Sequence, residues 1–129
     1  MATKFFDPSS IKYLHLSNCR LESIDPRLAL LTNLLEVDLS GNQLSSLPET
    51  LVALRNLQTL NLLCNLETLN ASHNHLKTFP PDFSNLSNLR NLLVSENRFD
   101  SVPVDFEKLV LLEYADFYSN LIEDFRVKQ

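Results

Sequence analysis

The fold is decided by the stretch LLEVDLSGNQL, residues 34–44. Its apolar framework is Leu34, Val37 and Leu39, with a polar residue between the last two, and Asn42 follows. Alternation of apolar and polar residues is the period of a short β-strand with one buried face. The stretch therefore predicts a strand that leads into a turn at Asn42.

The same pattern, L-x-x-L-x-L-x-x-N/C-x-L, recurs along the chain. It begins at Ile11, Leu34, Leu66, Leu89 and Leu112. Consecutive starts are 23 residues apart, except between the second and third copies. A fixed period of this size is typical of a solenoid, in which each coil packs only on its neighbours.

The rest of each copy predicts a turn and a helical return. An apolar residue followed by proline comes after the turn, as in Leu47-Pro48, Phe79-Pro80 and Val102-Pro103. Proline ends strand pairing, and the apolar residues three apart that follow suit a 3₁₀ or short α turn. We therefore expect an α/β leucine-rich solenoid, a right-handed β-α superhelix with a parallel concave sheet and 3₁₀ or short α turns on the convex side.

The copies divide the chain into two parts, an N-terminal segment at residues 1–10 and a repeat domain at residues 11–129. The terminal coil of a solenoid exposes an apolar edge unless something caps it. We expect the N-terminal segment to be a partial cap, in which Phe5 and Phe6 cover Ile11 and Leu14.

The period is interrupted by a clipped copy at residues 57–65, directly before the Leu66 copy. A coil needs about 20 residues to return to the same face, so these two segments cannot both be adjacent strands. We expect the Leu66 copy to supply the strand, and residues 57–65 to be extruded or to extend the preceding return. A spliced or deleted repeat that leaves a packing defect is the alternative.

The ninth position of the pattern forms a polar column. Its members are Cys19, Asn42, Asn74, Asn97 and Asn120. The column lies where the chain leaves the strand with unpaired backbone groups. An Asn side chain both donates and accepts hydrogen bonds, and the Cys19 thiol can make a weaker one, so we assign the column a structural role between coils.

With these motifs the chain resembles the leucine-rich repeat family over nearly its whole length. The 23-residue copies with x-x-L-P after the Asn turn are similar to the intracellular, Ras-group-like class. That resemblance implies a cytosolic scaffold, or an adaptor in a phosphatase or GTPase pathway. It implies the fold more strongly than any particular function, because one fold hosts many activities.

Composition narrows the classes of function. The 129-residue chain has a formal net charge of −5, with 11 Lys and Arg scattered among 16 Asp and Glu, so nucleic acid and anionic membranes are poor partners. Gly41 is the single glycine, which argues against glycine-rich phosphate loops. No apolar run reaches the roughly 18 residues of a membrane span.

The N-terminal residues and the cysteines favour an intracellular location. The first residues contain no apolar stretch of the kind that forms a secretory signal. Cys19 and Cys64 form no CxxC motif. We therefore expect free thiols and a cytoplasmic protein, with the nucleus as the alternative.

Side chains that alternate with the buried leucines are expected to project from the concave face. The expected partner-binding residues are Tyr13, His15, Glu36, Asp38, Asn70, Asn91, Leu93, Tyr114, Asp116 and Tyr118. The face is acidic overall, and tyrosines are frequent anchors at interfaces. We expect a protein partner with a basic or mixed surface. Binding through the loops or the convex face, and the lack of a specific site, are the alternatives.

The groups that resemble catalytic or metal sites are better explained by the repeat. His73 and His75 flank the ladder residue Asn74 and have no third ligand nearby in sequence. The serines recur at the seventh position of the pattern, which indicates turn chemistry. We expect no metal, no cofactor and no small-molecule substrate.

The sequence thus predicts a non-enzymatic module for protein–protein interaction. One alternative is a regulatory subunit in a phosphatase or small-GTPase signalling pathway. A hydrolase is another, and a truncated isoform or fragment of a longer repeat protein is the last.

Overall fold

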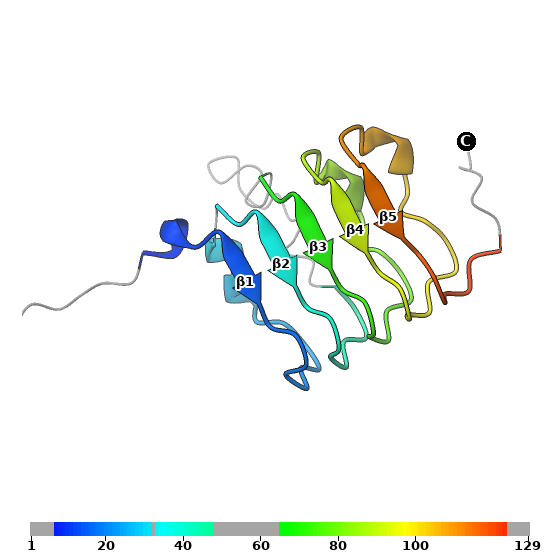
Figure 1. The fold of residues 1–129 in the computed structure, drawn as a ribbon, viewed down its shortest axis with the longest axis horizontal. Coiled ribbons are helices and arrows are strands. Elements are labelled where there is room, and N and C mark those ends of the chain that lie inside the picture. The colour runs from blue at the N-terminus through cyan, green and yellow to red at the C-terminus, as the bar shows by residue number, and fades with distance from the viewer. Residues whose placement is uncertain (1–6, 32, 48–64, 124–129) are drawn as a thin grey trace, which may run out of the picture.

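The computed structural model describes residues 7–31, 33–47 and 65–123 (Figure 1). They form a solenoid with one parallel sheet of five strands in chain order. The strands are β1 (Tyr13–His15), β2 (Glu36–Asp38), β3 (Thr68–Asn70), β4 (Asn91–Leu93) and β5 (Tyr114–Asp116). Each strand comes from one copy of the repeat, and the predicted fold class is confirmed.

Neighbouring strands pair so that equivalent residues of successive copies lie side by side. The register aligns Leu14, Val37, Leu69, Leu92 and Ala115. The three central members of this row are fully buried. Because side chains alternate across a strand, the residues on either side of them face the opposite, concave surface.

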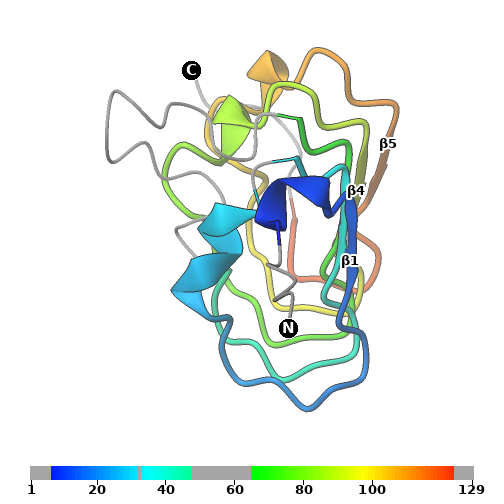
Figure 2. The same cartoon turned by 90° about the vertical axis from the view of Figure 1, so that its left-hand side faces the viewer.

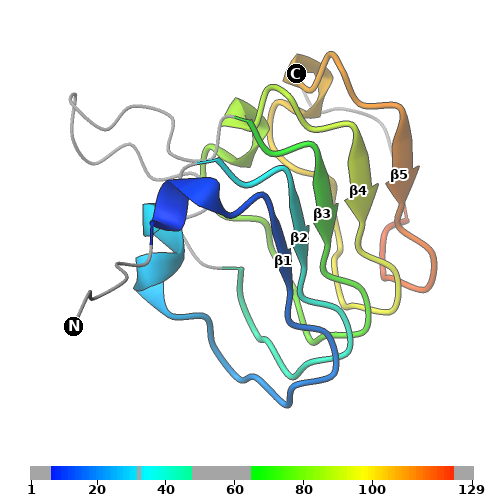
Figure 3. The same ribbon diagram turned by 60° about the vertical axis from the view of Figure 1, so that its left-hand side comes forward.

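The return segments among the described residues lie on the other side of the core from the sheet and are 3₁₀ helices (Figure 3). They are η2 (Pro26–Leu30), η5 (Phe83–Asn85) and η6 (Phe106–Lys108), while η1 (Pro8–Ser10) precedes the first copy. Side chains at i and i+3 of a 3₁₀ helix lie on the same side of it, so apolar residues spaced three apart can all face the core. Of the two predicted forms of the return, the described residues adopt the 3₁₀ form.

The core fills the interior of the coils, which Figure 2 shows from the N-terminal end. Leucines dominate it, and an aromatic cluster joins the third and fourth copies. The ring centroids of Phe79 and Phe99 are 4.1 Å apart in a stacked arrangement, and those of Phe79 and Phe83 are 4.8 Å apart. The core therefore runs through successive coils without a break at this junction.

Strand β2 pairs directly with β3, although the clipped copy lies between them in the sequence. The sheet thus passes from the Leu34 copy to the Leu66 copy with no strand between them. The expectation for residues 57–65 falls, apart from Asn65, outside the described residues. The expected cap residues Phe5 and Phe6 lie outside them too.

Candidate functional site

The concave face carries three straight rows of side chains that cross all five strands. The backbone pairing puts equivalent residues in line. The first row is Lys12, Leu35, Glu67, Arg90 and Glu113; the second is Tyr13, Glu36, Thr68, Asn91 and Tyr114; the third is His15, Asp38, Asn70, Leu93 and Asp116. The second and third rows hold nine of the expected partner-binding residues, and Tyr118 lies in the turn after β5.

Ion pairs form between strands within the first row. Arg90 Nη1 lies 2.8 Å from Glu113 Oε1, and Arg90 Nε lies 3.5 Å from Glu67 Oε1. All three side chains are well exposed, so water screens these pairs and each contributes little to stability. One cation, Arg90, therefore lies between two acids, while the row as a whole has no net formal charge because it also contains Lys12.

Contacts between adjacent strands also occur in the other rows. His15 Nε2 lies against Glu36 Oε2 across β1 and β2. Asn91 Nδ2 donates to Thr68 Oγ1 at 3.1 Å across β3 and β4. The sheet therefore orients these side chains through their neighbours as well as through the backbone.

Three polar residues of the third row also build the turn that follows their own strand, β2, β3 or β5. Asp38 Oδ1 accepts from the backbone N–H of Ser40 at 3.0 Å and from its hydroxyl at 2.6 Å. Asn70 Oδ1 accepts from Ser72 N at 3.1 Å, and Asp116 Oδ1 accepts from Tyr118 N at 2.9 Å. From the sequence alone, these side chains were expected only to bind a partner. The missed signal is the Asp or Asn two residues before the turn, which is typical of an Asx turn.

The tyrosines occupy the two ends of the concave face rather than its centre. Tyr13 on β1 is 62% exposed, Tyr114 on β5 is 54% exposed, and Tyr118 is 75% exposed. Leu93, in the interior of the sheet, is half-buried. The expected aromatic anchors therefore lie at opposite edges of the sheet and do not form one cluster.

Beyond the carboxyl ends of the strands, the Asn column connects each coil to the one before it. Asn42 Oδ1 accepts from the backbone N–H groups of Cys19 and Leu21, both at 3.0 Å. Asn42 Nδ2 donates at 2.9 Å to Leu16 O in the preceding coil and to Leu39 O in its own. Equivalent bonds to both coils are made by Asn74, Asn97 and Asn120.

The first member of the column differs from the others. Cys19 is exposed, and its thiol donates to Ser17 O in its own coil at 3.3 Å. His73 and His75 are both exposed on either side of the buried Asn74. The described residues contain no group of three or more His, Cys, Asp or Glu placed to hold a metal ion.

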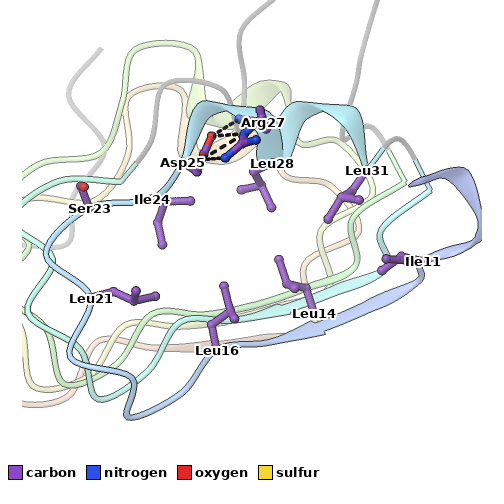
Figure 4. A pocket seen from close by; sticks show the side chains of 10 residues that line it. All are labelled: Ile11, Leu14, Leu16, Leu21, Ser23, Ile24, Asp25, Arg27, Leu28 and Leu31. Atoms are coloured by element: carbon purple, nitrogen blue, oxygen red, sulfur yellow. Dashed lines mark hydrogen bonds and ion pairs between the residues drawn. The ribbon is translucent and has the colours of Figure 1, made fainter. Parts of the chain in front are cut away.

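An apolar cavity of about 510 Å³ lies at the N-terminal end of the solenoid (Figure 4). The side chains that point into it are Ile11, Leu14, Leu16, Leu21, Ile24, Leu28 and Leu31. Asp25 and Arg27 lie at its rim, where Asp25 Oδ2 is 2.6 Å from Arg27 Nη2. Hydrogen bonds from the Arg27 side chain and backbone lower the pKa of the Asp25 carboxyl to about 2.

Comparison with known proteins places this architecture in a family. Two family models described as leucine rich repeat match residues 9–65 and 65–86. The chain belongs to the leucine-rich repeat family. An uncharacterized leucine-rich repeat-containing protein of Schizosaccharomyces pombe is 35% identical over 117 residues, which are 90% of this chain and 17% of that protein. The volume-regulated anion channel subunit LRRC8D of Rattus norvegicus is 31% identical over 95 residues, covering 74% of this chain and 10% of that one.

Solved leucine-rich repeat structures show the same arrangement. A leucine-rich repeat protein of Leptospira interrogans matches with a TM-score of 0.78 at 30% identity, over 89% of this chain and 27% of that one. This leucine-rich repeat chain therefore spans only a small part of the relatives it matches. The helices of its described part are short 3₁₀ turns, none of which has the length and hydrophobicity of a membrane span.

Proposed function

We propose that this leucine-rich repeat module binds a protein partner on its concave face and catalyses no reaction itself. Leucine-rich repeat proteins in general mediate protein–protein interaction. The observation that carries the proposal is the set of three in-register rows, which present polar and aromatic side chains from five strands on one continuous surface.

The charges of the concave face define the partner that it suits. Lys12 and Arg90 are its cations, against the acids Glu36, Asp38, Glu67, Glu113 and Asp116, so its formal charge is 2 − 5 = −3. Arg90 is already paired with two of those acids. A partner with a basic or mixed surface is favoured because complementary charge accelerates encounter and selects among partners.

The rigidity of the face supports binding. Side chains held by strand pairing and by neighbouring rows lose little conformational freedom when a partner docks, so more of the contact energy appears as affinity. The exposed free thiol of Cys19 is in keeping with a reducing compartment, the cytoplasm or the nucleus.

The test compares Leu93→Arg, on the interior strand β4 of the concave face, with Val104→Arg, which introduces the same side chain at an exposed return residue. Affinity capture from a cytosolic lysate, followed by mass spectrometry, identifies proteins held by the wild type. We expect Leu93→Arg to lose them and Val104→Arg to retain them, with circular dichroism showing equal folding. Loss with Val104→Arg alone would move the binding surface to the convex side.

A further inference from the structure

The charges of the concave face are distributed unevenly over its strands. Two acidic flanks contain Glu36 and Asp38 on β2, and Glu113 and Asp116 on the coil of β5. Strands β3 and β4 lie between these flanks (Figure 1). Their concave residues have no net formal charge, because Glu67 and Arg90 cancel and the others are neutral. The face therefore has a neutral centre between two acidic flanks.

The polar groups of the neutral centre already have partners within the chain. Asn91 Nδ2 donates to Thr68 Oγ1 at 3.1 Å, and Asn70 Oδ1 accepts from Ser72 N at 3.1 Å. The half-buried Leu93 adds apolar surface beside them. Covering a polar group costs most when it loses water without gaining a hydrogen bond. The centre can therefore be covered by an apolar surface at a lower cost.

The aspartates of the acidic flanks keep an unpaired negative charge. Asp38 and Asp116 accept hydrogen bonds from uncharged groups of the turns that follow them. Within the described part of the chain, no cation pairs with either of them. Glu36 contacts His15, and Glu113 pairs with Arg90. The flanks can therefore bind additional cations, most strongly at the aspartates.

We propose that the partner presents a basic amphipathic helix, which lies over β3 and β4 with its axis parallel to the strands. This rests on binding at the concave face, as proposed above. Neighbouring strands are about 4.8 Å apart, so the three steps from β2 to β5 span about 14 Å. A helix with its side chains is about 10–12 Å wide. Its apolar side then covers the neutral centre, and Lys or Arg side chains on its two sides reach both flanks.

The acids of each flank are spaced like residues on one side of a helix. Glu36 and Asp38 are two residues apart, about 7 Å in an extended strand, and helix residues i and i+4 are about 6 Å apart along the axis. Glu113 and Asp116 are three residues apart, about 10 Å, which matches residues i and i+7. Two cations on each side of the helix therefore face two acids.

Residues next to the acidic flanks favour the same placement. Lys12 belongs to the coil of β1, on the other side of β2 from the neutral centre, so a basic helix over β3 and β4 stays away from it. Each flank also has an exposed tyrosine, since Tyr13 is paired in register with Glu36, and Tyr114 directly follows Glu113. A Lys or Arg side chain is attracted to the face of such a ring.

Fluorescence anisotropy with synthetic peptides tests the proposal on the intact chain. The probe is a labelled peptide of about 18 residues, long enough to form a helix, with leucine along one face and lysine on both sides of that face. A scrambled peptide has the same composition but no such face. We expect the probe to bind about tenfold more tightly than the scrambled peptide. Equal binding would show that charge alone is recognised and would overturn the helix.

A third peptide tests the need for two flanks. It has the same leucine face and the same number of lysines, all on one side of that face. It reaches one acidic flank only, so we expect it to bind more weakly than the probe. Binding as tight as that of the probe would overturn the placement between the two flanks.

Charge reversals on the protein test each flank. They are made at the glutamates, because the aspartates also hold turns. Glu36→Lys and Glu113→Lys should each weaken probe binding about fivefold, since each replaces attraction by repulsion. Glu107→Lys makes the same change at an exposed residue of η6, across the core from the sheet, and should leave the affinity unchanged. Equal weakening by all three variants, each shown to be folded by circular dichroism, would overturn the proposal.

Leu93→Arg separates this inference from the function on which it rests. The variant places a cation in the neutral centre and should abolish probe binding. If Leu93→Arg loses cellular partners but the wild type does not bind the probe, the helical partner is rejected and concave-face binding stands. A probe that binds the wild type and Leu93→Arg equally would place the helix off the concave face and overturn the proposal.

Discussion

At the residue scale, the turn before each ladder position needs a left-handed backbone. Asn18, Gly41, His73, Glu96 and Ser119 hold this position in the five copies, with φ between 54° and 67°. Only Gly41 adopts it without steric cost. An ideal Cβ at Gly41 would lie 2.0 Å from Asn18 Oδ1, the end of an exposed side chain that can turn away.

The change Gly41→Ala is therefore expected to lower the free energy of unfolding by about 1 kcal/mol, mainly because of the positive φ. Urea denaturation measures this cost, with Ser45→Ala at an exposed neighbour as the control. Adding Asn18→Ala should recover little of the loss. Full recovery in the double variant would show that the contact, and not the backbone, causes it.

The carboxyl of Asp25 offers a prediction on pH. Arg27→Ala should raise the pKa of Asp25 from about 2 toward its usual value of 3.8, because the largest cause of the lowering is the hydrogen bond from the Arg27 side chain. A pKa that is lower in the folded state contributes stability above the unfolded pKa, and that contribution is lost as the pH falls from 3.8 to about 2.

NMR titration of the Asp25 side-chain carboxyl carbon measures this pKa directly. Arg20→Ala removes another exposed cation of the same coil and serves as the control. An Asp25 pKa that stays near 2 in Arg27→Ala would show that the backbone N–H at position 27, the second cause, is sufficient.

At the scale of elements, the Asn column compensates for the shortness of the strands. Each strand has three residues, so few backbone bonds join one coil to the next. Asn97 Oδ1 accepts a hydrogen bond from Leu76 N at 3.0 Å, and Asn97 Nδ2 donates one to Ala71 O at 3.0 Å. All three of these residues are buried, so water cannot replace the amide.

Asn97→Ala should therefore cost about 3 kcal/mol of stability, since it leaves buried backbone groups without partners. Asn120→Ala removes equivalent bonds at the last coil, where Asn120 is half-buried, and should cost about 1 kcal/mol because water can take its place. Chemical denaturation of both variants measures the difference. Equal costs would mean that burial does not set the strength of the column.

For the whole molecule, each coil contacts only the coils next to it, so the core extends along the stack of coils instead of gathering around one centre.

The periodic features of this protein could be predicted from the sequence. Positions such as Leu34, Val37 and Asn42 recur at a constant interval, and a coil contacts only its neighbours, so a local pattern is enough to define the strand, the turn and the return. The family and the fold class follow from that pattern.

Other features depended on which groups meet in space. The Asx turns of Asp38 and Asn70, the placement of Tyr13 and Tyr114 at opposite edges, the choice of the 3₁₀ form and the open cavity beside Leu14 are of this kind. The pattern treats all copies as equivalent, whereas burial and pairing depend on whether another coil lies on each side. By itself, the sequence determined the repeating coil; only the tertiary structure decided what each coil leaves exposed, because exposure is a property of neighbours and not of the repeat.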